Sequence, residues 1–271
     1  MTQPTNTEDL ARRIRVNAVN MVDIQGFGYL GQALGTAEIM AVIFGERYWR
    51  QGVDRFVLSP GHYAITFYAV AAEIGLIPRE ALADYGKDDA LLEAISTERT
   101  PVIDLTCGSL AQGLSGGIGL ALAQRFAGDG GRTIALISDG EMEEGQTWEA
   151  AMFAAHHKVD NLIAVMDVNN SQVDGPITFV TTVEPIADKW RAFGWNVIEC
   201  DGHDVGALRQ GMDAALASDR PTVILAKTDI LGGLKSFPST VDGHFIKLTP
   251  ELTRDVLEEL SPPARMTRNG C

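Results

Sequence analysis

The feature that most constrains the fold of this chain is a repeated alternation of short apolar runs with helical segments. The runs follow one another as DRFVLSP, RTIALIS, NLIAVMDVN, NVIECDG and PTVILAKT, and segments with helical apolar spacing separate them. Continuous apolar strands that alternate with helices are typical of a parallel sheet covered on both faces. We therefore predict an α/β fold, with a parallel sheet and helices on both of its faces.

Length and composition favour one large domain. The chain has 271 residues, of which 45% are hydrophobic, and this is enough for a sizeable single core. The sequence contains no internal repeat and no second composition regime. We expect a flexible arm over residues 1–6, one α/β domain over residues 7–260 and a tail over residues 261–271.

The charge and the cysteines narrow the class of protein. A net charge of −14 argues against nucleic-acid binding and against an anionic membrane surface. The sequence has no run of 18 apolar residues and no apolar signal segment at its start, so we expect no membrane association. Cys107, Cys200 and Cys271 are scattered and odd in number, which favours reduced thiols and a cytoplasmic protein.

Polar residues follow three of the apolar runs, where a parallel sheet binds its ligands. RTIALIS is followed by Asp139 and Gly140, NLIAVMDV by Asn169, and DRFVLS by a segment with His62. Neighbouring strand ends lie roughly 5 Å apart, so Asp139 and Asn169 could share a hard cation such as Mg²⁺. Gly140 would let a phosphate approach the backbone. The alternative is that Asp139 is a helix N-cap and the asparagines form a turn.

Four ordered segments carry a resemblance to a known family. SDGEMEEGQTWEAAMFAAHHKVDNLIAVMDVNNSQVDG resembles the thiamin diphosphate motif, and more narrowly that of transketolases. DRFVLSPGHYAITFYAVAAEIG, TPVIDLTCGSLAQGLSGGIGLALAQR and PTVILAKT with the later Asp-Gly-His at 242–244 resemble transketolase segments in the same order. The resemblance covers about residues 10–260. It implies the diphosphate-binding type of thiamin diphosphate fold, with thiamin diphosphate and Mg²⁺ as cofactors.

The resemblance also implies roles for individual residues. The implied Mg²⁺ ligands are Asp139, Asn169 and the backbone carbonyl of Ser171, and Gly140 is implied to contact the diphosphate. It also implies that His62 and His244 face the diphosphate and the reaction centre. The loop residues Gly108, Ser109 and Leu110 are implied to reach the aminopyrimidine. Glu144 and Glu149 are implied to belong to an acidic network at a subunit interface. Glu141 and Glu143 are expected to be charged residues of a first helical turn, favoured by the helix dipole.

The chain resembles only the first of three transketolase domains. In that family the glutamate that activates the aminopyrimidine comes from the second domain of a partner chain. We therefore expect a split enzyme whose second subunit, of about 300 residues by usual domain sizes, carries the pyrimidine-binding and C-terminal domains. An α2β2 heterotetramer is the expected assembly.

Two positions depart from the transketolase pattern. Tyr29 stands where the family has a histidine, and Glu93, Ala94 and Ile95 replace its Gly-His-Pro. A phenol is a poor general base at neutral pH, although we count Tyr29 with His62 and His244 as catalytic candidates. Loss of these donors weakens binding of a polyol, so a 2-oxo acid such as pyruvate is an alternative to a ketose donor. Two further readings stay open: a 2-oxo acid decarboxylating subunit, and a non-catalytic cofactor-binding or assembly subunit.

Overall fold

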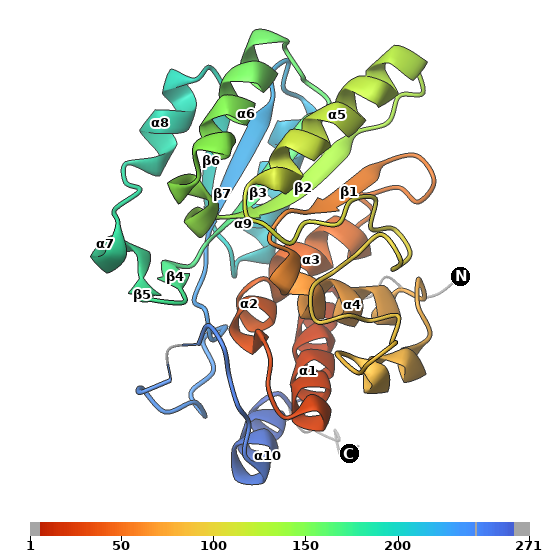
Figure 1. Ribbon diagram of the computed structural model, residues 1–271, viewed down its shortest axis with the longest axis vertical. Helices are drawn as coiled ribbons and strands as arrows, with labels where there is room; N and C mark the ends of the chain where they lie inside the picture. The colour runs from red at the N-terminus through yellow and green to blue at the C-terminus, as the bar shows by residue number, and fades with distance from the viewer. Residues whose placement is uncertain (1–5, 242, 263–271) are drawn as a thin grey trace, which may run out of the picture.

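A computed structural model describes residues 6–241 and 243–262 of the chain. Its centre is a five-stranded sheet with the order β1-β2-β3-β7-β6 (Figure 1). The strands are β1 Arg55–Leu58, β2 Thr133–Ser138, β3 Leu162–Val168, β7 Thr222–Lys227 and β6 Asn196–Asp201. Every neighbouring pair in this sheet is parallel, which confirms the predicted α/β class.

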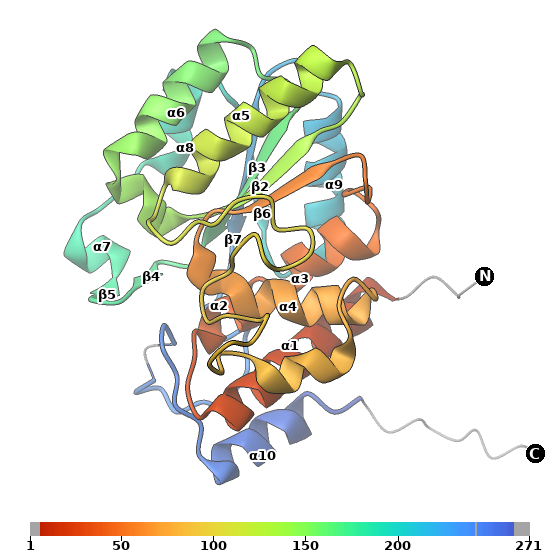
Figure 2. The same cartoon turned by 45° about the vertical axis from the view of Figure 1, so that its right-hand side comes forward.

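One face of the sheet is covered by α5 Gln112–Ala127, α6 Gly145–His156 and α8 Ile186–Ala192 (Figure 2). Side chains alternate between the two faces along each strand. Ala135 and Ile137 of β2 therefore lie in the core under these helices, while Ile134 and Leu136 belong to the core on the opposite face. Burial on both faces explains why these strands read as continuous apolar runs.

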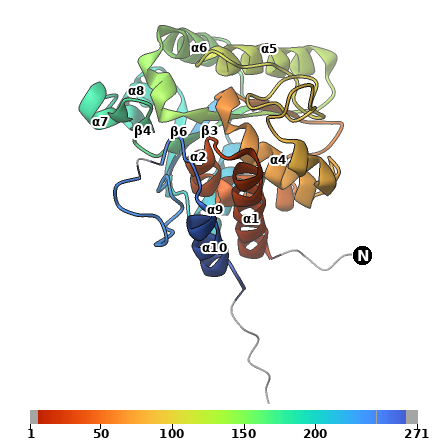
Figure 3. The ribbon, with the colours of Figure 1, turned by 60° about the horizontal axis from the view of Figure 1, so that its bottom comes forward.

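The opposite face is covered by α9 Val205–Leu216, α4 Ala64–Glu73 and the short helix α3 Ala37–Met40, which continues as a π-helical turn Ala41–Gly45. Outside this layer lie α1 Thr7–Gln25 and, packed on α1, α10 Pro250–Glu259 (Figure 3). Two 3₁₀ turns, Gly61–Tyr63 and Arg79–Asp84, flank α4 in the sequence.

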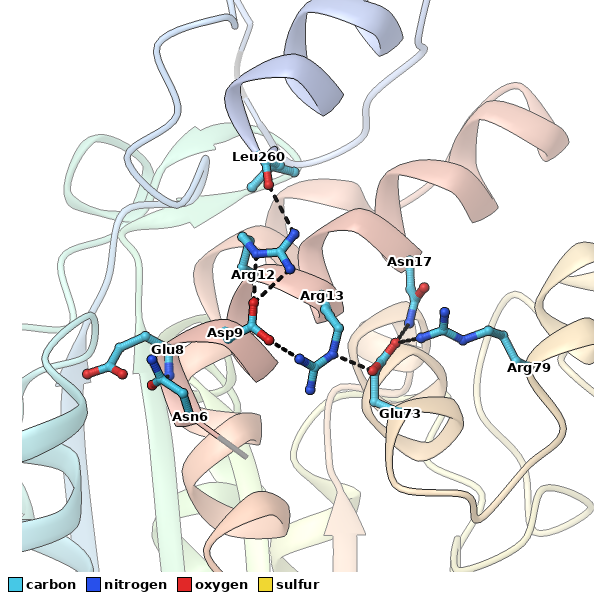
Figure 4. A network of polar contacts seen from close by, with 9 residues as sticks. All are labelled: Asn6, Glu8, Asp9, Arg12, Arg13, Asn17, Glu73, Arg79 and Leu260. Carbon is cyan, nitrogen blue, oxygen red and sulfur yellow. Dashed lines mark hydrogen bonds and ion pairs between the residues drawn. The ribbon is translucent and has the colours of Figure 1, made fainter. Parts of the chain in front are cut away.

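A polar network ties α1 to its neighbours (Figure 4). Arg13 Nε donates to Glu73 Oε2 at 2.6 Å, and Asn17 Nδ2 donates to Glu73 Oε1 at 2.9 Å. Arg12 Nη1 donates to the carbonyl oxygen of Leu260 at 3.2 Å. These bonds join the first helix to the end of α4 and to the C-terminus of α10.

Three segments differ from the sequence expectation. The glycine-rich loop after α1 contains a fully buried helix, α2 Leu30–Gly35, which is too short to show a helical period. The segment after Asn169 forms a hairpin of β4 Ser171–Gln172 and β5 Gly175–Pro176, followed by α7 Ile177–Val180. The acidic segment Asp139–Glu143 is a separate 3₁₀ turn before α6.

The limits of the domain stay a prediction. Residues 1–5 of the expected arm and 263–271 of the expected tail lie outside the described residues. Within the described ranges, the helices all fall short of the length and apolar character that a membrane crossing requires.

Candidate active site

The carboxyl ends of β1, β2 and β3 lie side by side. Leu58 pairs with Leu136, and Ser138 pairs with Asp167, so the three strands end at the same edge of the sheet. Because the chain leaves each strand at this edge, the segments that contain His62, Asp139 and Asn169 start from neighbouring points. The prediction that these strand ends converge is confirmed.

Backbone hydrogen bonds join the loops that follow β2 and β3. The buried Asp139 accepts the N–H of Gly140 through Oδ1 at 3.0 Å and that of Asn170 through Oδ2 at 2.7 Å. Ser171 N donates to Asn169 Oδ1 at 2.8 Å. The side-chain oxygens of Asp139 and Asn169 and the backbone of Ser171 thus belong to one small region.

Asp167, a residue that was not among the predicted site residues, orients Asn169. Asp167 Oδ2 accepts Asn169 Nδ2 at 2.5 Å and the hydroxyl of Tyr63 at 2.8 Å, and Oδ1 accepts the hydroxyl of Thr228. Because the amide nitrogen of Asn169 is held by Asp167, its oxygen Oδ1 faces the Ser171 side. The signal was present in the sequence: an Asp inside a buried apolar run requires polar partners.

When ionised, the two aspartates place negative charge in a buried region. Burial and, to a smaller extent, the nearby Asp167 raise the pKa of Asp139 to about 8. Burial also raises the pKa of Asp167. Over the described ranges neither carboxylate forms an ion pair with Lys, Arg or His. A divalent cation held by oxygen ligands would offset this charge.

The oxygen atoms of Asp139, Asn169 and Ser171 can hold a cation only if a bound molecule supplies further oxygen ligands. In the part of the chain that the structure describes, there is no group of three His, Cys, Asp or Glu residues that could hold a metal ion. One carboxylate, one amide oxygen and one carbonyl suit Mg²⁺ when phosphate oxygens and water complete its octahedron. A Cβ built on Gly140 would meet only Ile177 Cδ1, at 3.9 Å, so a phosphate has room to approach this backbone.

Glu141 corrects an expectation. It is 1% exposed and is not a solvent-facing residue of a first helical turn. Its carboxylate accepts the backbone N–H of Ala111 at 2.7 Å and of Ser138 at 2.8 Å, and also the hydroxyl of Ser59. Burial raises the pKa of Glu141. This residue joins the ends of β1 and β2 to the loop before α5, whereas Glu143 is exposed as expected.

The loop that precedes α5 lies next to Glu141 and is largely exposed. Gly108 and Ser109 are exposed and Leu110 is half-buried, while Ala111 is held by Glu141. Glu144 and Glu149 are exposed at the start of α6 and within it. The structure places these five residues on the surface and does not bring Glu144 and Glu149 into the polar cluster around Asp139.

Tyr29, His62 and His244 form an aromatic cluster, although they come from three distant segments. The ring centroids are 4.9 Å apart for Tyr29 and His62, 5.6 Å for His62 and His244, and 5.8 Å for Tyr29 and His244. Phe245 packs on Tyr29 with a centroid distance of 5.1 Å. Burial and the neighbouring His244 lower the pKa of His62 to about 3, so His62 is neutral at physiological pH.

The segment that replaces the family's Gly-His-Pro lies beside His62. Ser96 N donates to the carbonyl oxygen of Gly61 at 3.0 Å, which places the preceding Ile95 next to this turn. Ile95 is half-buried and Ala94 is exposed. The position therefore presents apolar groups near the histidine cluster.

The fold and the polar strand ends define a class: a parallel α/β protein whose site lies beyond the carboxyl edge of its sheet. The chain matches the family described as transketolase, thiamine diphosphate binding domain, over residues 6–255. It is 40% identical over 252 residues to the transketolase family protein y4mO of Sinorhizobium fredii, covering 89% of this chain and 90% of that protein. This chain therefore belongs to the transketolase family and represents its thiamine diphosphate binding domain.

Other relatives and solved structures agree with this assignment. The chain is 34% identical over 268 residues to SqwG of a Clostridium species, named 6-deoxy-6-sulfo-D-fructose transketolase subunit, covering 95% of this chain and 97% of SqwG. The TM-score is 0.86 with transketolase of Campylobacter jejuni, at 24% identity, and 0.85 with a variant transketolase of Pichia stipitis, at 26% identity. These matches cover 94% and 96% of this chain, but it spans only 42% and 43% of those two chains.

Proposed function

We propose that this chain is the diphosphate-holding subunit of a two-chain enzyme that transfers a two-carbon unit to an aldehyde or ketone acceptor. The enzyme depends on thiamin diphosphate and Mg²⁺. The observation that carries the proposal is the joined end of β2 and β3, where Asp139 accepts the backbone N–H of Asn170 and Asp167 holds the neighbouring Asn169. The near-complete coverage of SqwG, which is named as a subunit, supports a split enzyme.

In this proposal each polar residue at the sheet edge has a defined task. Asp139, the amide oxygen of Asn169 and the carbonyl of Ser171 hold Mg²⁺, and Gly140 gives the diphosphate access to the backbone. The cofactor, when bound, stabilises the carbanion formed at the donor carbon. Two sets of residues complete the proposed site. Tyr29, His62 and His244 lie beside the reacting groups. Gly108, Ser109 and Leu110 lie toward the aminopyrimidine.

The proposed partner supplies what this chain lacks. The chain spans less than half of the solved transketolases to which it is similar, and the remaining domains would come from a second subunit. That subunit would hold the pyrimidine end of the cofactor and meet the exposed Glu144 and Glu149. We propose an α2β2 assembly located in the cytoplasm.

The donor substrate is inferred from the side chains that lie near His62. Tyr29 and Ala94 offer fewer polar contacts to a polyol than the histidines that transketolases carry at these positions, so a standard sugar phosphate is expected to bind less well. A 2-oxo acid such as pyruvate is the second candidate, because it requires fewer hydroxyl contacts. Rates with xylulose 5-phosphate and with pyruvate, measured on the reconstituted pair, decide between the two donors.

The central test measures binding of thiamin diphosphate by calorimetry in Mg²⁺, for the chain alone and with its partner. We expect tight binding and turnover only for the pair, and loss of both in D139N. D160N is the matched control, since Asp160 is exposed next to the amino end of β3. Full turnover by the lone chain contradicts the split enzyme. Cofactor binding by the pair without any turnover identifies a non-catalytic binding subunit instead.

A further inference from the structure

Gln32 contacts His244 from the short buried helix α2. The side chain of Gln32 is fully buried in α2, and its Nε2 lies 3.1 Å from Nδ1 of His244. An amide nitrogen has hydrogens to donate and no lone pair to offer, so Nδ1 of His244 is the acceptor. A neutral imidazole carries one proton, and that proton therefore resides on Nε2 of His244.

The helix that carries Gln32 is held against the segment that carries His244. A Cβ built on Gly31 would lie 2.0 Å from the carbonyl oxygen of Gly243, so the two backbones are in direct contact. The hydroxyl of Thr36 donates to the carbonyl oxygen of Gln32 at 2.6 Å, and Arg15 Nε donates to that of Leu34 at 3.0 Å. These contacts hold the backbone around Gln32 in place, next to the backbone of Gly243 that precedes His244.

The side-chain oxygen of Gln32, unlike its nitrogen, forms no stabilising hydrogen bond with the described residues. Its Oε1 is buried and has no hydrogen-bond partner among the described residues. A buried carbonyl oxygen without a donor lowers stability, so an apolar side chain of similar volume would suit a purely structural position better. The contact to His244 is the favourable interaction that the amide provides here.

We propose that Gln32 is a positioning residue that holds His244 as the Nε2–H tautomer. The ring of His244 also packs on Tyr29 and His62, so its orientation is restricted on several sides. In this tautomer the ring presents an N–H donor on the side away from Gln32. Resting on the proposed function, that donor serves an oxygen atom of the bound cofactor or donor substrate.

The tautomer is tested on the full chain with ¹⁵N-labelled histidine, by two-bond ¹H–¹⁵N NMR at pH 8. The signals of His244 are assigned by their loss in H244Q. We expect the Nε2–H pattern in the wild type. In Q32E a carboxylate can only accept, so we expect His244 to carry a proton on Nδ1. An Nδ1–H pattern in the wild type, or an unchanged pattern in Q32E, overturns the proposal.

Two further variants separate positioning from folding. Q32M keeps the volume and removes the donor, so we expect it to fold and to lose the preference for the Nε2–H form. Q210E is the control, since Gln210 is exposed on α9 and its change should leave the spectrum of His244 unaltered. If Q32E does not fold, Q32M alone decides, and a retained Nε2–H preference in it contradicts the role of Gln32.

The catalytic consequence is measured on the pair of subunits. Misplacement of a group at a reaction centre costs up to about 100-fold in rate, and we expect Q32M to lower kcat with a smaller change in KM. Unchanged kcat in Q32M, in an active wild-type enzyme, overturns the link to catalysis. A wild-type pair without any turnover contradicts the proposed function instead, and the NMR result on His244 stands apart from it.

Discussion

At the scale of single residues, the polar strand ends depend on buried groups that do not touch the proposed ligand. Asp167 accepts three side-chain hydrogen bonds, from Thr228, Tyr63 and Asn169. It leaves the oxygen of Asn169 on the side where Mg²⁺ is proposed to bind. Mutation of groups that orient metal ligands typically lowers metal affinity by about 10- to 100-fold.

The first prediction concerns D167N. The new amide cannot accept on both sides, so Asn169 loses its fixed orientation, and we expect Mg²⁺-dependent cofactor affinity of the subunit pair to fall about 10- to 100-fold. Calorimetry at saturating Mg²⁺ measures the effect, with D160N as the control of equal charge change. An unaltered affinity in D167N would show that Asp167 does not orient the site.

At the scale of elements, α2 sets the position of the segment that carries His244. Its glycines permit backbone contact with distant loops. Arg15 of α1 donates to the carbonyl oxygen of Leu34, and Thr36, the residue after α2, bonds Thr66 of α4. A helix of six residues has little stability of its own in water. Packing from several sides therefore stabilises it.

The second prediction is that G31A is destabilising. A methyl group here would lie 2.0 Å from the carbonyl oxygen of Gly243, and such overpacking costs about 1–3 kcal/mol of unfolding free energy. Gly119 of α5 provides the control, since a Cβ there meets nothing within 4 Å. Urea unfolding should show G119A to be unaffected or more stable, by up to about 1 kcal/mol. Equal stability of G31A and wild type would contradict the close contact.

A network of charged and polar groups joins α1, α3 and the segments that follow β6 and β7, at the carboxyl end of the sheet. Nη1 and Nη2 of Arg15 donate to Glu38, at 2.5 and 2.6 Å, and His203 Nδ1 lies 3.1 Å from Glu38 Oε2. Asp229 N donates to His203 Nε2 at 2.8 Å, so the loop after β7 is part of the network.

The third prediction follows from the pKa of Glu38. Burial opposes its ionisation, but the hydrogen bonds from His203 and Arg15 outweigh burial and lower its pKa below 4.5. A lowered carboxyl pKa stabilises the fold above the unfolded-state pKa, and this contribution is lost as the pH falls through the folded-state pKa. E38Q leaves Arg15 unpaired, and we expect it to destabilise the protein by about 3–5 kcal/mol at pH 7.

Urea unfolding of wild type and E38Q at pH 7 and at several values below pH 4.5 tests this dependence. The difference in unfolding free energy should shrink as the pH falls, because the Glu38 carboxylate of the wild type becomes protonated. E258Q is the control, since Glu258 is exposed on α10. A difference between wild type and E38Q that stays constant over this range would rule out ionised Glu38 as its source.

At the scale of the whole molecule, one edge of the sheet carries the proposed cofactor site and leaves part of it exposed. Gly108 and Ser109 face solvent, as do Glu144 and Glu149. The proposed pair assigns these exposed groups to the interface with the second subunit.

The fourth prediction concerns assembly. Because Glu149 is exposed, we expect E149K to change the stability of the isolated chain by no more than about 0.5 kcal/mol. We expect the same change to weaken the proposed α2β2 complex by at least tenfold in dissociation constant, as measured by mass photometry. E251K, on α10, is the control. Unchanged association of E149K would place the subunit interface elsewhere.

The sequence predicted the strands and most of the long helices because hydrophobic periodicity is a local property. It did not predict α2 or the 3₁₀ turn at Asp139–Glu143, since short buried elements depend on their neighbours and show no period of their own. The sequence indicated that Glu141 is a charged residue of a first helical turn, and it does lie in the first turn of this 3₁₀ helix. Its burial by contacts with Ser59 and Ala111 depends on distant segments and left no local signal.

By itself, the sequence determined the α/β class, the family resemblance and the position of Asp139 and Asn169 after two buried strands. These follow from local patterns and from the geometry of parallel strands. Only the tertiary structure decided which side chains support the site. The contact of Gln32 with His244 spans 212 residues, and that of Tyr63 with Asp167 spans 104. No local pattern encodes such pairs, because they arise only when the packed layers bring distant segments together.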